Sequence, residues 1–135
     1  MPWLLRRVSQ RYRSATASRL AAAGFGDLPQ RGYWALTALA GDAGDASELV
    51  SQMGITKQAI SKLVDVLVAS GLVDREIDSV DRRRTTLRLT AKGRKAVAVI
   101  EQAVRTTERE FAAELGAASF EDLTRKLARL ADKGT

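Results

Sequence analysis

The sequence contains neither cysteine nor histidine. Their absence excludes disulfide bonds, zinc sites built from Cys and His, thiolate nucleophiles and acid–base catalysis by imidazole. The 16 acidic residues are scattered among 22 Lys and Arg and show no metal-ligand spacing. We therefore expect no metal site, no cofactor and no enzymatic activity.

Long apolar runs are also missing. The longest, such as residues 96–100, is far too short for a membrane-spanning helix or for the apolar region of a signal peptide. We therefore expect a soluble, cytoplasmic protein. The 135 residues suffice for one domain with one core, and the net charge of +6 favours a polyanionic partner. Charge alone does not distinguish nucleic acid from an acidic membrane surface.

Hydrophobic periodicity predicts a mainly helical chain with one hairpin. Helices are expected over residues 3–23, 29–40, 46–53 and 57–70, and from a cap at Thr90 to about Leu115. Pro29 is expected to be the first residue of its helix. The spacing Ser119-Phe120-Glu121-Asp122 is that of a capping box, which predicts that a last helix opens there. Strands are expected over residues 72–77 and 85–89, with a loop over 78–83.

A tight turn separates the helices expected at 46–53 and 57–70. Gly54 can adopt the left-handed conformation that ends the first helix, and the Thr56 hydroxyl can accept a backbone N–H at the start of the second. Two helices joined by so short a turn must cross steeply, as in a helix-turn-helix. The expected fold is therefore a winged helix-turn-helix, mainly α with a small β-hairpin as its wing.

The helix expected at 57–70 has two distinct sides. Its apolar side carries Ile60, Leu63, Val64, Leu67 and Val68, and its opposite side carries Gln58, Lys62, Asp65 and Ala69, with Ser61 beside them. The first turns of a recognition helix read base edges, so Gln58, Ser61 and Lys62 are predicted to contact bases, and Thr56 and Lys57 to lie nearer the phosphates. Asp65 either accepts a hydrogen bond from cytosine or marks where the helix leaves the groove. The alternative is an ordinary solvated helix face.

Three consecutive arginines, Arg82, Arg83 and Arg84, follow Asp81 in the hairpin loop. Adjacent like charges repel one another, so this arrangement favours an anionic partner, and arginine in a narrow minor groove meets a strongly negative potential. Asp81 could hold one guanidinium group in a bidentate pair. The alternative is a turn that only improves solubility.

A longer pattern runs through the predicted hairpin: Gly71-Leu72-Val73, Arg75, Asp81-Arg82-Arg83, residues 87–90 and Gly93. This pattern resembles the wing signature of the MarR family of bacterial transcription regulators, and the order of helices extends the resemblance over nearly the whole chain. The resemblance implies an obligate homodimer, bound to a pseudopalindromic operator, with Arg83 in the minor groove. The residues alone leave all three arginines as candidates. Arg75 joins the expected DNA contacts.

We expect a single domain over residues 1–135, with a DNA-binding lobe at 28–90 and, as the resemblance implies, intertwined dimerisation helices at 1–24 and 91–135. Two DNA-binding units about one helical turn (roughly 10 base pairs) apart bind a duplex more tightly than one unit does. The apolar faces of residues 4–20 and 120–130 also need partners. The alternative is that they fold back on the chain's own core.

The resemblance further implies a small, often phenolic effector that releases many members from DNA by wedging between the dimerisation helices and the lobe. The predicted lining is Tyr12, Phe25, Tyr33 and Trp34, with Arg11 or Arg31 as an anion partner. The alternative is that these aromatic residues belong to the core.

The leading hypothesis is therefore a homodimeric repressor that binds double-stranded DNA and has no membrane partner. A rival from another class is a winged-helix module that binds a protein and uses its charge only for solubility. The slope of affinity against salt distinguishes the two, because only phosphate contacts release many counterions.

Overall fold

The computed structural model describes residues 1–26, 28–41 and 43–133. Its elements follow the order α1 (Pro2–Ala22), α2 (Gln30–Ala40), α3 (Ala46–Met53), α4 (Lys57–Ala69), β1 (Val73–Ile77), β2 (Thr85–Leu89), α5 (Ala91–Leu115) and α6 (Ala117–Asp132). Helices around one antiparallel hairpin confirm the predicted fold class. The last two residues of the expected dimerisation segment, 134 and 135, lie outside the described residues.

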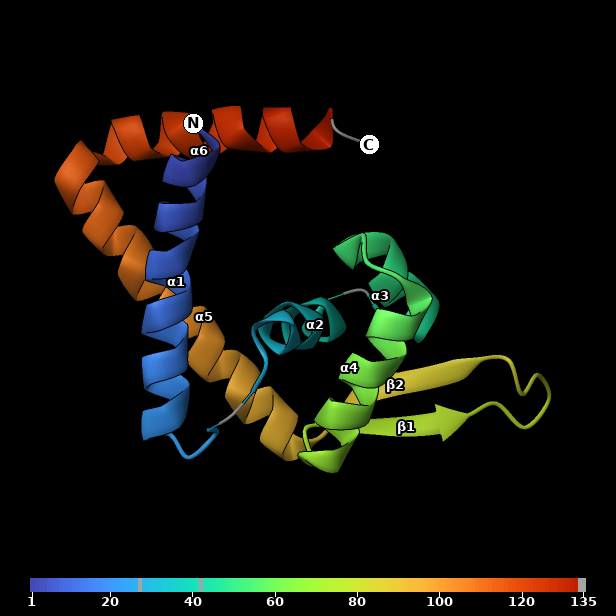
Figure 1. Cartoon of the computed structure of the whole chain (residues 1–135). Helices are drawn as coiled ribbons and strands as arrows, with labels where there is room; N and C mark the ends of the chain where they lie inside the picture. Colours follow the sequence, from blue (N-terminus) through green and yellow to red (C-terminus); the bar gives the residue numbers. More distant parts are fainter. Residues whose placement is uncertain (27, 42, 134–135) are drawn as a thin grey trace.

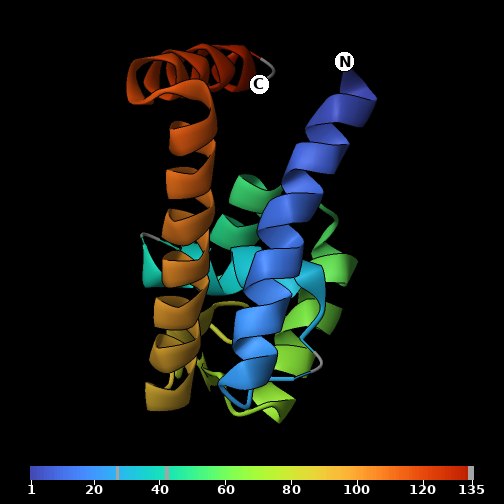
Figure 2. The ribbon, with the colours of Figure 1, turned by 90° about the vertical axis from the view of Figure 1, so that its left-hand side faces the viewer.

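The elements form two parts that differ in shape (Figure 1). A compact lobe contains α2, α3, α4 and the hairpin, and the long helices α1 and α5 lie along one side of it. Figure 2 shows α1 and α5 side by side, with α6 turning away at their far end. Both views place α6 and the N-terminal end of α1 at the end of the molecule that is distant from the wing.

The core lies inside the lobe and against the first half of α5. Leu36 of α2, Leu49 of α3 and Ile60 and Leu67 of α4 are fully buried. The hairpin and α5 complete this core with Val73, Leu87, Ala96, Val97 and Ile100. Because α4 contributes its whole apolar side to the core, its orientation is fixed by packing.

Local capping fixes the ends of α3 and α4. Asp45 caps α3 by accepting the Glu48 N–H at 2.8 Å. Gly54 ends α3 with φ of 64°, in the left-handed region that favours glycine, and the Thr56 hydroxyl accepts the Ala59 N–H at 3.1 Å. The predicted turn of the helix-turn-helix is confirmed.

The hairpin is attached to the lobe through the segment before α3. Its register pairs Val73 with Leu89 and Ile77 with Thr85. The Leu87 N–H donates to the Gly44 carbonyl at 2.9 Å, and Asp45 forms a bridge with Thr86. These contacts connect the wing to the segment that leads into α3.

A close junction joins the end of α4, the hairpin and the start of α5. The Thr90 hydroxyl donates to the Gly71 carbonyl at 2.6 Å and accepts the Gly93 N–H at 2.9 Å, as its predicted capping role requires. A Cβ atom added at Gly93 would lie 2.0 Å from the Leu72 carbonyl oxygen. Only glycine allows α5 to start this close to the end of α4.

The predicted start of the last helix is wrong. Gly116 ends α5 with φ of 86°, and α6 begins directly at Ala117 without a side-chain cap. The Phe120 N–H donates to the Gly116 carbonyl at 3.0 Å, so Ser119 already lies inside the first turn. Two alanines, strong helix formers, extend the helix upstream of the apparent capping box.

Three smaller boundaries also differ from the prediction. Pro29 has ψ of 147° and is the cap of α2, so that helix begins one residue later. The Leu72 N–H closes α4 by donating to the Leu67 carbonyl at 3.0 Å, and β1 therefore starts at Val73. The loop extends to Arg84, whose N–H donates to the Asp81 carbonyl at 2.9 Å.

Candidate nucleic-acid interface

The side of α4 that faces away from the core is polar. Ile60, Leu63, Val64 and Leu67 are buried, which confirms the predicted apolar side. The residues proposed to face a ligand are all exposed: Thr56, Lys57, Gln58, Ser61 and Lys62. The Thr56 oxygen accepts the capping bond, and its hydroxyl proton remains available to a phosphate at the positive end of the helix dipole.

Asp65, at the far end of the same side, is paired within the chain. Its Oδ1 accepts a hydrogen bond from Arg75 Nη2, so an ion pair joins α4 to β1. Neither role predicted for Asp65 included this partner, because ten positions separate the two residues. Arg75, predicted as a DNA contact, thus also links β1 to α4.

The tip of the wing is held by hydrogen bonds to two aspartates. The Asp78 carboxylate accepts the N–H groups of Val80 at 2.8 Å and Asp81 at 3.3 Å. These two bonds lower the pKa of Asp78, because they favour the charged carboxylate. Asp81 Oδ1 accepts the Arg83 N–H at 3.1 Å. The tip therefore has a defined conformation.

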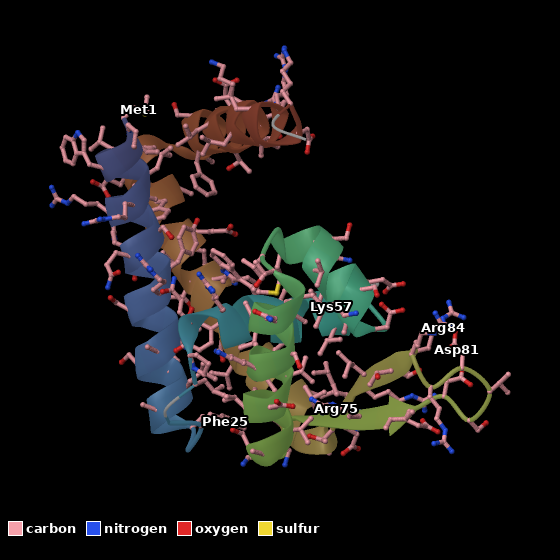
Figure 3. All side chains as sticks on the ribbon, turned by 45° about the vertical axis from the view of Figure 1, so that its right-hand side comes forward. Met1, Phe25, Lys57, Arg75, Asp81 and Arg84 are labelled. Atoms are coloured by element: carbon pink, nitrogen blue, oxygen red, sulfur yellow. The ribbon has the colours of Figure 1, made fainter. Side chains whose placement is uncertain are left out.

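The three wing arginines are exposed at this tip. The side chain of Arg83 is 96% exposed, and its Nε lies 3.8 Å from Asp81 Oδ1. This is a single ion pair, and the predicted bidentate pair with Asp81 is not formed. Figure 3 shows Arg84 and Asp81 at the wing tip and Lys57 at the start of α4, all on the side away from α1.

This arrangement presents two basic surfaces of different shape. The first turns of α4 are a rod that can enter a major groove, and the wing is a narrow basic projection. No described helix is long and apolar enough to span a membrane. Within the described ranges, acidic side chains form no group of three or more that could hold a metal ion.

A cavity of about 770 Å³ lies between the long helices and the lobe. Three of the predicted aromatic residues, Tyr12, Tyr33 and Trp34, line it. Burial, and to a lesser extent the negative charge of Glu108, raises the pKa of the Tyr12 hydroxyl. The rings of Tyr12 and Phe111 also pack nearly at right angles, with centroids 5.3 Å apart.

The cation of this cavity is Arg13, which sequence reasoning missed. Arg13 Nη1 donates to Gln30 Oε1 at 2.6 Å, and its buried Nε has no hydrogen-bond acceptor among the described residues. Ser9, Arg13 and Thr16 lie on one side of α1 at helical spacing, but spacing alone does not show that this side faces the cavity.

The other predicted lining residues lie elsewhere. Phe25 packs against the core. Arg11 pairs with Glu110 at 3.3 Å and lies over the Phe111 ring. Arg31 is exposed and does not line the cavity. The predicted choice between Arg11 and Arg31 as the anion partner was therefore wrong for this cavity.

The ends of the long helices expose many apolar side chains. None of the residues of α6 is buried. The exposed apolar residues near this end of the molecule are Met1, Trp3, Leu4, Leu5, Val8, Leu115, Leu123, Leu127 and Leu130. Within the described residues, the chain does not cover these faces by folding back on its own core.

Fold and surface together define a winged helix-turn-helix protein with a basic wing. The sequence model of the MarR family matches residues 27–84. A protein of Thauera aromatica, named for transcriptional regulation of the hcr operon, is 36% identical over 99 residues, which cover 73% of this chain and 60% of that protein. This chain belongs to the MarR family. It spans about 60% of the length of the Thauera aromatica relative.

Solved structures show the same fold over nearly the whole chain. A crystal structure of MarR has a TM-score of 0.82 at 21% identity and covers 99% of this chain and 90% of its own. The repressor CouR, bound to a 23-mer DNA duplex, has a TM-score of 0.81 at 26% identity. The match covers 97% of this chain and 92% of the CouR chain. The S. aureus MepR–DNA complex has a TM-score of 0.78 at 20% identity, and the match covers 98% of this chain and 97% of the MepR chain.

Proposed function

We propose that this protein is a homodimeric transcriptional repressor that binds a pseudopalindromic site on double-stranded DNA. The observation that carries the proposal is that α4 and the wing tip expose polar and basic residues. Figure 3 shows Lys57 of α4 and Arg84 of the wing tip on the side away from α1. The similarity to CouR and MepR, both solved with DNA, supports it.

The recognition helix supplies the contacts that depend on sequence. Gln58, Ser61 and Lys62 face base edges in the major groove, where glutamine pairs best with adenine and lysine with guanine. Thr56 and Lys57, at the first turn, contact phosphates. Because α4 is fixed by its buried side, these side chains reach the groove in one orientation.

The wing supplies contacts that depend mainly on charge and groove shape. Arg83 enters the minor groove, and Arg82 and Arg84 lie against the phosphates on either side. Asp81 shapes the loop through its bonds to Arg83 and Arg84. Arg75 acts on the wing's position through its ion pair with Asp65.

A second copy of the chain covers the exposed apolar faces of α1 and α6. Leu123 and Leu127 are 42% and 40% exposed, and Leu130 is 70% exposed. Removing such surfaces from water stabilises a dimer. Pairing also places two recognition helices on one duplex, which multiplies affinity without any new contact per half-site.

The cavity is proposed as the site of a small aromatic anion that weakens DNA binding. Its aromatic residues offer flat surfaces, and Arg13 Nε is a buried donor that an anion would satisfy. The ligand would act by favouring a different separation of the two recognition helices. In a Trp3→Phe background, benzoate should change Trp34 fluorescence, and Arg13→Met should abolish the change. A response that persists in Arg13→Met contradicts this assignment.

Selection from a random duplex pool tests DNA binding directly. We expect enrichment of an inverted repeat, and failure to enrich any such sequence contradicts the proposal. Gln58→Ala should relax preference at one position of each half-site, and Arg83→Ala should weaken binding on all sequences. A flat response of affinity to salt would instead indicate a protein partner.

A further inference from the structure

The wing tip carries the most exposed of the large apolar side chains in the described part of the chain. Val80 is 94% exposed, and Ile77, at the end of β1, is 61% exposed. Hairpin tips usually carry Gly, Asn, Asp or Ser, because these residues suit turn geometry. A β-branched valine gains nothing from the turn, and its exposure to water is unfavourable. The fold gives no reason for an apolar side chain at this position.

The turn nevertheless holds Val80 in a defined place. The Val80 N–H donates to the Asp78 carboxylate at 2.8 Å, and the Asp78 N–H donates to the Arg84 carbonyl at 3.0 Å. A side chain on an ordered turn loses little conformational entropy when it docks. Val80 is thus presented outward on a prearranged loop.

The charge around Val80 decides what it can dock against. Arg82, Arg83 and Arg84 follow it within four positions and are all exposed. On a duplex, the apolar surface nearest to phosphate is that of the deoxyribose rings, which form the walls of the minor groove. Minor-groove proteins combine arginines in the groove with apolar side chains, which many of them insert between base steps. A protein or lipid surface would require a larger apolar patch than one valine and one isoleucine.

We propose that Val80 contacts DNA by packing against the deoxyribose wall of the minor groove beside Arg83. The inference rests on the proposed function and adds a contact that releases no counterion. This contact also gives a role to the hydrogen bonds of Asp78 and Asp81, which hold Val80 and the neighbouring arginines in one arrangement. With Val80 against the groove wall, the positions of the guanidinium groups in the groove are restricted.

Three variants test the contact on the duplex enriched by selection. Fluorescence anisotropy would measure the affinity of Val80→Ser, Val80→Ile and the neighbouring control Ser79→Ala over a range of salt. We expect Val80→Ser to weaken binding about fivefold, because the apolar contact is lost. The slope of log affinity against log salt should stay unchanged, and the other two variants should bind within about twofold of the original chain. Thermal unfolding midpoints should match, since Val80 is exposed.

The possible results separate the two proposals. If the original chain binds no duplex, the proposed function fails. If it binds DNA and Val80→Ser binds equally well, only the valine contact is wrong. If Val80→Ser loses affinity and also lowers the salt slope by about 1, as Arg83→Ala should, the valine acts through the arginines and the contact is again overturned.

Discussion

The helices α4 and α6 are both amphipathic, yet the chain treats them differently. The apolar side of α4 is buried, with Leu67 fully inaccessible. In α6 no residue is buried, and Leu123 and Leu127 remain about two-fifths exposed. Amphipathic periodicity therefore predicts that a face needs cover, but it does not identify the chain that supplies the cover. The core of the chain covers the apolar side of α4, whereas the apolar side of α6 stays exposed.

The largest effect is expected when charge is placed on the exposed apolar side of α6, which is proposed to contact the second copy. Leu123→Glu combined with Leu127→Glu should convert a dimer to a monomer in sedimentation equilibrium. DNA affinity should then fall about a hundredfold or more, because the two half-sites are no longer linked. Arg125→Glu, on the other side of α6, should leave the mass dimeric. A double variant that remains dimeric would show that this face is not the interface.

The next effect concerns the side of α4 that the chain covers itself. Leu67→Ala should lower the free energy of unfolding by about 2–5 kcal/mol, because it leaves a cavity in the core. The adjacent Val66 is 42% exposed, so Val66→Ala should cost less than about 1 kcal/mol. Urea denaturation at one protein concentration measures both. Similar losses for the two variants would contradict the orientation of α4.

A smaller effect tests the link between α4 and the wing. Asp65→Asn removes the ion pair with Arg75, whose side chain is 36% exposed. Because solvent screens this pair, unfolding should become easier by no more than about 1 kcal/mol. Glu76→Gln, on the same strand as Arg75, is the control and should have no effect in urea denaturation. A loss above about 3 kcal/mol for Asp65→Asn would mean that the pair is a core interaction.

The smallest expected effect is a pH dependence of the wing tip that α4 does not share. Because hydrogen bonds lower the pKa of Asp78, the turn keeps its stabilisation above the ordinary aspartate range. It loses that stabilisation as the pH falls through the lowered pKa. The amide resonance of Val80 should therefore titrate with a midpoint below that of a free aspartate, and Asp78→Asn should abolish the transition. The Ala59 amide, bonded to the Thr56 hydroxyl, should not titrate with it.

Features set by neighbouring residues could be predicted from the sequence. The Gly54 turn, the Thr56 and Thr90 caps and the two sides of α4 depend on spacings of a few residues, and all are confirmed. The capping box failed because Ala117 and Ala118 favour helix as strongly as Ser119 favours a cap.

Features set by contacts between distant segments could not be predicted. The pairing of Asp65 with Arg75 requires the angle between α4 and the hairpin, which no local pattern encodes. The position of Arg13 at the cavity likewise depends on how α1 lies against α2. The exposed leucines of α6 were predicted to need a partner, and the monomer leaves that need unmet.

The glycine junction at residue 93 makes α5 a lever. Its 25 residues extend about 37 Å, so a rotation of about 5° about the junction moves its far end by about 3 Å. Thr90 and Gly93 contact Gly71 and Leu72 directly, so the junction has little free space in which such a rotation could be absorbed. In the proposed dimer, a small displacement of the far end of α5 would therefore change the direction in which the wing points.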